Sequence, residues 1–280
     1  MRDHAYDEIP YRAPEMPHRY GPSVHVVAEP LALTQLARLC AKGTIQPDIN
    51  RLVGELYRDL LRVIVNAEFP RRAAATPTRM IDHTPNGVFH GETIDPEVRV
   101  VTVNIARAGT LPSQITYDFF NTVFDPRLVR QDHFVMARVL DDASKVIGAR
   151  ISGSKIGGDV DDAILLFPDP MGATGGSICT ALDAYKTQVV GTPRKVIAAH
   201  LIVTPEYLKR VTSQHPGTVI YALRLDRGLS PPEVFDTVPG TLWERERGLD
   251  DRQYIVPGGG EGELAAESRE LLVLLGGQSG

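Results

Sequence analysis

The chain has 280 residues, of which 42% are hydrophobic and 23% charged, proportions that are ordinary for a soluble globular protein. Its net charge of −5 and pI of about 5.9 argue against a general nucleic-acid binder and leave room only for a local basic patch. Two cysteines, Cys40 and Cys179, do not make a disulfide framework, and no apolar run approaches membrane-spanning length. We therefore expect a cytoplasmic protein without a membrane partner.

The first third of the sequence predicts a tail, a short strand and two helices. Residues 1–22 are polar and proline-containing, and we expect them to form an extended tail. Residues 24–27 favour a strand, and apolar residues at helical spacing then predict helices from residue 31 to 40 and from 48 to 66. The stretch 76–93, rich in Thr, Pro, Asn and Gly, indicates a connection that contains a hairpin.

Three strands are predicted next, and cationic residues accompany them. A β-branched run at 98–104 predicts a core strand that leads into a turn with Arg107. Ligands of open α/β sheets bind at the carboxyl ends of strands, and a guanidinium at that edge can hold an anion bidentately. Residues 133–139 and 146–151 predict two more strands, with Arg138 in the first and Lys155 just after the second.

The most informative stretch runs from residue 162 to 186. Five apolar residues, 163–167, predict a strand buried in a parallel sheet, a Gly- and Pro-rich loop follows, and residues 178–186 predict a helix. The unpaired backbone N–H groups and the dipole of a helix start form a ready anion site, which glycines let a ligand approach closely. The loop is neither a Walker loop nor a GxGxxG fingerprint.

The remaining elements continue the alternation of strand and helix. Residues 195–203 and 219–226 predict core strands, with a helix at 206–214 between them. This alternation predicts an α/β fold with a mainly parallel sheet and helices on both faces. We expect one domain over residues 23–280. A glycine-rich segment, 253–263, lies near its end.

Residues Asp169 to Ser177 resemble, at every fixed position, the Asp-Pro-Met-x-Ala-Thr-Gly-Gly-Ser loop of uracil phosphoribosyltransferases, which are type I phosphoribosyltransferases. Four other stretches are similar to the same family: 105–109, 204–206, 215–216 and 253–263. The resemblance implies a type I phosphoribosyltransferase-like fold with a β-arm near 140–155 and a small base-binding hood at about 251–264. Residues 230–250 are then an insertion that the family usually lacks, for which we expect a surface hairpin or subunit contact rather than a lid.

The resemblance also implies an activity and its residues: transfer of the phosphoribosyl group from phosphoribosyl diphosphate (PRPP) to uracil, giving UMP and pyrophosphate. Asp169 and Arg107 would be catalytic. The residues implied for PRPP are Arg107, Arg138, Lys155, Asp169, Met171, Gly172, Ala173, Thr174, Gly175, Gly176 and Ser177. Those implied for uracil are Tyr254, Ile255, Gly260 and Glu261. Magnesium would arrive with PRPP and would need no protein ligands of its own.

Several departures from the family pattern keep other functions open. Cys40 and Asn50 stand where the family often has Arg, and Asn104 and Ala106 alter the turn before Arg107. In the hood, Glu261 replaces Asp and one residue is missing. A phosphoribosyltransferase for another nucleobase and a non-catalytic PRPP or nucleotide sensor are therefore the alternatives. The family tends to form dimers or higher oligomers, and we expect a homo-oligomer here.

Overall fold

We describe a computed structural model of the chain, which covers residues 3–140 and 146–259, with side chains for 3–136 and 150–259. The strands are β1 (Val24–Val26), β2 (Arg71–Pro77), β3 (Val88–Ile94), β4 (Val100–Ala106), β5 (Val129–Leu140), β6 (Val146–Lys155), β7 (Ile164–Pro168), β8 (Met171–Gly172), β9 (Lys195–Val203) and β10 (Thr218–Leu225). The α-helices are α1 (Pro30–Leu39), α2 (Asp48–Glu68), α3 (Thr110–Val123), α4 (Gly176–Gln188), α5 (Pro205–Gln214) and α6 (Pro232–Phe235). Within these ranges no helix is long and apolar enough to cross a membrane.

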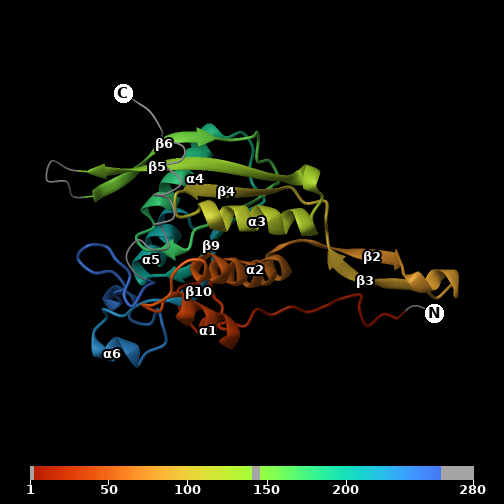
Figure 1. Cartoon of the computed structure of the whole chain (residues 1–280), viewed down its shortest axis with the longest axis horizontal. Coiled ribbons are helices and arrows are strands. Elements are labelled where there is room, and N and C mark those ends of the chain that lie inside the picture. The colour runs from red at the N-terminus through yellow and green to blue at the C-terminus, as the bar shows by residue number, and fades with distance from the viewer. Residues whose placement is uncertain (1–2, 141–145, 260–280) are drawn as a thin grey trace.

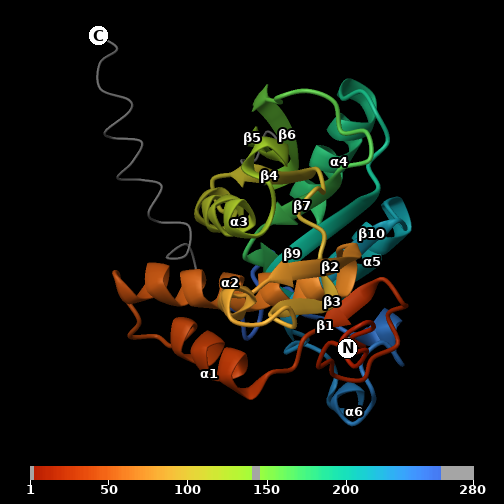
Figure 2. The same ribbon diagram turned by 90° about the vertical axis from the view of Figure 1, so that its right-hand side faces the viewer.

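The core of the molecule is an eight-stranded sheet in the order β1-β10-β9-β7-β4-β5-β6, with β8 paired to β9. Every neighbouring pair is parallel except β5 and β6, which form an antiparallel hairpin where the resemblance placed a β-arm. Helices α1, α2 and α3 cover one face of the sheet, and α4 and α5 cover the other (Figures 1 and 2). The predicted fold class is confirmed.

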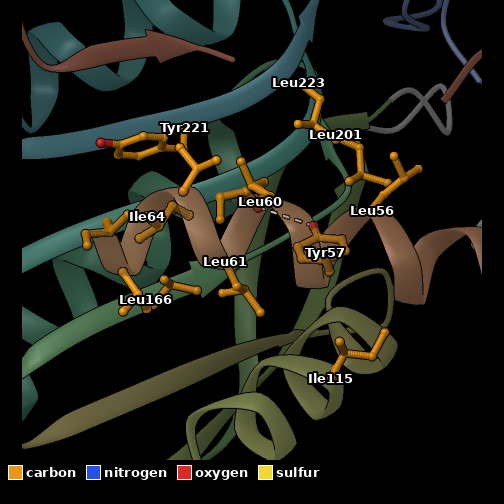
Figure 3. Packing of buried hydrophobic residues seen from close by; sticks show 14 of the residues in the cluster. Leu56, Tyr57, Leu60, Leu61, Ile64, Ile115, Leu166, Leu201, Tyr221 and Leu223 are labelled. Carbon is orange, nitrogen blue, oxygen red and sulfur yellow. Dashed lines mark hydrogen bonds between the residues drawn. The ribbon is translucent and has the colours of Figure 1, made fainter. Parts of the chain in front are cut away.

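Helix α2 supplies much of the core because its apolar residues recur on one face. Leu56, Leu60 and Ile64 are fully buried, and they lie against Leu201 and Tyr221 of the sheet (Figure 3). Tyr57 lies on the same helix, and its hydroxyl donates a hydrogen bond of 3.2 Å to the carbonyl oxygen of Ala199. This pairing satisfies a hydroxyl whose burial would otherwise carry a cost.

A second, two-stranded sheet projects from the body as an arm. Strands β2 and β3 pair antiparallel, and the arm extends well away from the main sheet with the N-terminal segment beside it (Figure 1). The Glu92 amide donates to the Tyr6 carbonyl oxygen at 2.7 Å, which ties that segment to β3. The hairpin predicted within 76–93 is present, but its first strand begins earlier, at Arg71.

The insertion at 230–250 is anchored to the N-terminal segment through a buried carboxylate. Glu246 accepts hydrogen bonds from the Tyr20 hydroxyl and from the Gly240 amide (2.7 Å), and it pairs with Arg227 at 3.3 Å. The Trp243 indole donates to the Pro205 carbonyl oxygen at 3.0 Å. The insertion therefore packs on the body of the protein and is partly buried.

Replacing the buried Glu246 by Gln is expected to destabilise the protein by about 3 kcal/mol, because it leaves the partly buried Arg227 guanidinium without its counter-charge. The matched control is Glu244→Gln, which breaks an exposed pair with Lys209 and should cost at most about 1 kcal/mol. The free energy of unfolding in urea measures both variants. Equal effects would contradict a structural role for Glu246.

Candidate functional site

The site lies where the connections of the sheet change direction. The chain leaves β4 through α3 toward β5 on one side, whereas it leaves β7 through α4 toward β9 on the other. A crevice opens between the carboxyl ends of two neighbouring parallel strands at such a point, and it is where open α/β sheets bind ligands. Asp169 directly follows β7, and Arg107 directly follows β4.

The loop 169–177 is held in a fixed shape by its own glycines and by β9. Strand β8 pairs with β9, and a Cβ on Gly172 would lie 2.9 Å from Val203 Cγ1 and 3.0 Å from a ring carbon of Tyr207. Gly175 caps α4 in the left-handed conformation, with φ of +74°. The loop and the residues behind it line a small pocket: Asp169, Met171, Ala173, Thr174, Gly175, Gly176, Ser177, Ile178, His200 and Tyr207.

The pocket has the chemistry of an anion and sugar site. The first backbone amides of α4 have no partner inside the helix, and the helix dipole favours negative charge at that end. Thr174 and Ser177 add hydroxyls, and the Thr174 hydroxyl accepts the Gly176 amide at 3.3 Å. The structure thus brings together the predicted residues from Asp169 to Ser177.

Asp169 is fixed at the mouth of the pocket. One carboxylate oxygen accepts the Met171 amide at 3.1 Å, and burial raises the pKa of this carboxyl to about 6. Its backbone carbonyl oxygen accepts a hydrogen bond from Nδ1 of the buried His200 at 2.6 Å. The other ring nitrogen of His200 lies 2.5 Å from the Tyr207 hydroxyl.

His200 and Tyr207 were missed by the sequence analysis. Burial lowers the pKa of His200 to about 4, so the ring is neutral near pH 7. Because Nδ1 donates to the Asp169 carbonyl oxygen, Nε2 accepts from the Tyr207 hydroxyl. His200 thus fixes the backbone of Asp169, and Tyr207 fixes the ring of His200. The sequence offered only their places: His200 lies within the predicted strand 195–203, and Tyr207 directly follows the Thr-Pro-Glu turn.

Arg107 follows β4, the parallel neighbour of β7. Its side chain is exposed, and the structure gives it no hydrogen bond or ion pair with any described residue; the Ala106–Arg107 peptide bond is cis. Gly109 holds the turn close, since a Cβ there would lie 3.0 Å from the carbonyl oxygen of Pro168, the last residue of β7. The guanidinium is available to a ligand at the crevice.

The other two predicted cations lie on the β5–β6 hairpin, toward the edge of the sheet. Lys155 is exposed and pairs through its backbone with His133, which lies level with Asn104 of β4. Arg138 lies further along β5, beyond the level of Ala106, and its side chain is outside the described residues. Both residues thus belong to the hairpin on the side of β4 that faces away from β7.

The predicted hood lies against the ends of β9 and β10. The Val256 amide donates to the Gly248 carbonyl oxygen at 2.8 Å, and the Val256 carbonyl oxygen accepts the Gly228 amide at 3.0 Å. Tyr254 is 42% exposed, and the Ile255 side chain packs on the core. In the part of the hood that the structure describes, the backbone groups of Ile255 make no hydrogen bond. Gly260 and Glu261 lie outside the described residues.

Among the described residues, no group of three or more His, Cys, Asp and Glu side chains could hold a metal ion. Asp169 and the hydroxyls of Thr174 and Ser177 are hard oxygen donors, the type that Mg²⁺ prefers. They fit a magnesium ion that a phosphorylated substrate brings with it.

Comparison with known proteins gives a consistent picture. The sequence model of the uracil phosphoribosyltransferase family matches residues 26–242. A uracil phosphoribosyltransferase from Latilactobacillus sakei is 42% identical over 76 residues, covering 27% of this chain and only 35% of that protein. One from Rhodococcus jostii is 26% identical over 245 residues, covering 85% of this chain and 95% of that protein. A solved structure from Aquifex aeolicus shares the fold, with a TM-score of 0.63 at 22% identity, covering 87% of this chain and 98% of that one.

Proposed function

Because the chain belongs to the uracil phosphoribosyltransferase family, we propose that it transfers the phosphoribosyl group of PRPP to uracil, giving UMP and pyrophosphate. The observation that carries this proposal is the loop 169–177, which stands at the switch point of the sheet, where Arg107 follows the neighbouring strand β4. PRPP would enter as its magnesium complex, and the proposed compartment is the cytoplasm.

The loop 169–177 would bind the 5′-phosphate and ribose of PRPP. Amides at the start of α4, with the hydroxyls of Thr174 and Ser177, supply donors for phosphate oxygens. The Asp169 carboxylate is an acceptor for the ribose hydroxyls, and its negative charge would favour the oxocarbenium-like centre at C1′. Asp169 is well suited to this because Met171 and His200 hold it from two sides.

Arg107 would bind the leaving pyrophosphate, with Lys155 and Arg138 as further cations from the β5–β6 hairpin. The C1′–O bond to pyrophosphate breaks, a bond forms between C1′ and a pyrimidine nitrogen, and the nitrogen loses its proton. The reaction needs no covalent participation of the protein. Positioning of the two substrates and charge stabilisation on pyrophosphate would supply most of the acceleration.

The hood would read the base by its backbone. The amide and the carbonyl oxygen of Ile255 make no hydrogen bond with any described residue. Such a donor and acceptor match the acceptor and donor groups on the edge of a pyrimidine. Tyr254 would lie at the flank of the base, and Gly260 and Glu261 would complete this side of the site. Backbone recognition accounts for the glycines of the segment, since side chains would block close approach.

The departures of the hood from the family pattern keep two alternatives in view, transfer to a different base and PRPP sensing without turnover. They are separated by incubating the protein with magnesium, PRPP and one base at a time: uracil, cytosine, orotate or hypoxanthine. We expect nucleotide from uracil alone. Nucleotide from another base would reassign the acceptor, and calorimetric binding of PRPP without any turnover would favour a sensor.

A homo-oligomer is also part of the proposal. A two-stranded sheet is marginally stable by itself, and the β2–β3 arm carries exposed apolar side chains near its tip: Met80, Ile81 and Phe89. Contact with a second copy of the chain would cover them. Light scattering of the protein in solution measures the mass directly.

The pH dependence of the proposed reaction is expected to follow Asp169. Because burial raises the pKa of its carboxyl to about 6, the free protein loses the charged form below that pH. The value of kcat/KM for PRPP should then fall about tenfold for each pH unit below about 6. His200 would not contribute to the pH profile near pH 6, since burial lowers its pKa to about 4. A profile that stays flat down to the ordinary aspartate pKa of about 3.9 would contradict this role.

A further inference from the structure

The hood is held by the ion pair of Arg224 and Asp226, at the end of β10, which binds the two peptide groups that flank Gly258. Gly258 has a left-handed φ of +64°, and its amide donates to Asp226 Oδ2 at 2.8 Å. Its carbonyl oxygen accepts a hydrogen bond from Arg224 Nη2 at 2.9 Å. Both peptide groups of Gly258 therefore depend on side chains that lie far away in the sequence.

The ion pair of Arg224 and Asp226 is bidentate and largely buried. Arg224 Nε lies 2.6 Å from Asp226 Oδ1, and Nη2 lies 2.8 Å from Oδ2, a bidentate arrangement. The side chain of Asp226 is only 1% exposed and that of Arg224 is 23% exposed. Bidentate pairs of this kind fix geometry as well as adding energy, because the planar guanidinium allows one orientation.

The remaining nitrogen of the guanidinium, Nη1, lies near the end of α1. Arg224 Nη1 lies 3.8 Å from the sulfur of Cys40. Position 40 is where the family resemblance expects an arginine; in this chain Cys40 stands there, beside the guanidinium of Arg224. Arg224 thus joins three parts of the molecule at one point: the end of β10, the end of α1 and the hood.

Movement at Gly258 would be transmitted to the residue proposed to contact the base. A Cβ on Gly258 would lie 2.2 Å from the carbonyl oxygen of Ile255, so the two residues are packed closely across the turn. The backbone of Ile255 has no hydrogen bond of its own among the described residues, and its position therefore depends on its neighbours. The flanking residues Tyr254 and Val256 are held by hydrogen bonds within the segment 228–256. Gly258, on the other side of the turn, is held by the side chains of Arg224 and Asp226.

We propose that Arg224 is a positioning residue for the nucleobase: by fixing Gly258, it sets the place of the Ile255 backbone at which the base is read. This inference rests on the proposed function, because it assigns a nucleobase to the hood. It concerns only the base and leaves the binding of PRPP to the loop 169–177 unaffected.

Kinetics with two variants test the proposal. Arg224→Met removes the guanidinium, and we expect the KM for uracil to rise about tenfold or more while the KM for PRPP changes less than about twofold. Arg224→Lys keeps the charge beside Asp226 but loses the planar fork, so an intermediate KM for uracil is expected. It also carries the test if the methionine variant fails to fold. The matched control is Arg62→Met, which removes an exposed guanidinium from α2 and should change neither constant.

A merely structural Arg224 would give a different result. Both KM values would stay at those of the wild type, and only kcat would fall, in proportion to the folded fraction. That outcome overturns the proposal, as does an equal rise of both KM values.

Hydrogen exchange separates a failure of this proposal from a failure of the proposed function. If the wild-type protein turns over no base, the proposed function fails, and exchange at the Gly258 amide then decides the positioning claim alone. We expect that amide to exchange at least about tenfold faster in Arg224→Met, or in Arg224→Lys if the first variant is unfolded, while the amides of Ile220 and Ala222 in β10 keep their rates. Unchanged exchange at Gly258 would overturn the claim.

Discussion

Asp169→Asn is expected to lower kcat about 100- to 1,000-fold while the protein stays folded. Asparagine keeps an oxygen that can accept the Met171 amide, so the loop retains its shape. It loses the negative charge that would stabilise the oxocarbenium-like centre and accept the ribose hydroxyls. The free energy of unfolding should not fall, because the replaced carboxylate sits where burial disfavours its charged form.

Steady-state kinetics with uracil and PRPP check this expectation, and urea unfolding checks the fold. The matched control is Asp162→Asn, at the opposite end of β7, where the carboxylate is exposed and pairs with Arg194. That variant should keep its activity. Comparable activity in the two variants would show that Asp169 does not act in the reaction.

Arg107→Met is expected to lower kcat/KM for PRPP roughly 100-fold, because a guanidinium that binds pyrophosphate bidentately also stabilises the charge that develops on it as it leaves. The side chain of Arg107 has no hydrogen bond or ion pair among the described residues, so its loss should not change the free energy of unfolding. Lysine at this position should recover only part of the rate, since an ammonium cannot bind two oxygens in the same plane.

The control for Arg107 is Arg127→Met, which also removes an exposed guanidinium, one paired only with Asp125. Initial rates over a range of PRPP concentrations give kcat/KM for both proteins. If Arg107→Met behaves like the control, the pyrophosphate does not bind at the turn after β4, and the cations of the β5–β6 hairpin become the better candidates.

The parts of the site that the sequence predicted are those whose local chemistry dictates their shape. The apolar run 163–167, the glycines after it and the following helix formers specify strand, loop and helix without reference to the rest of the chain. The boundaries were less accurate: α4 begins at Gly176, two residues before the predicted start at 178. Helix ends depend on capping by neighbouring loops, which periodicity does not show.

What the sequence could not predict depends on contacts between distant residues. His200 and Tyr207 support Asp169 from β9 and α5, and Arg224 holds Gly258 from β10. None of these pairs has a spacing that signals it. The tail was expected to extend freely, yet Tyr20 is buried and bonded to Glu246 of the insertion, a partner that only the folded chain brings near.

The most direct test of the account is the stoichiometry of the proposed reaction. Radiolabelled uracil is incubated with the protein, magnesium and PRPP, and the UMP and pyrophosphate formed are both quantified. We predict equal amounts of the two products, each matching the uracil consumed. Pyrophosphate without UMP would mean that PRPP is hydrolysed or passed to another acceptor, and the absence of both products would contradict the proposed transfer at this site.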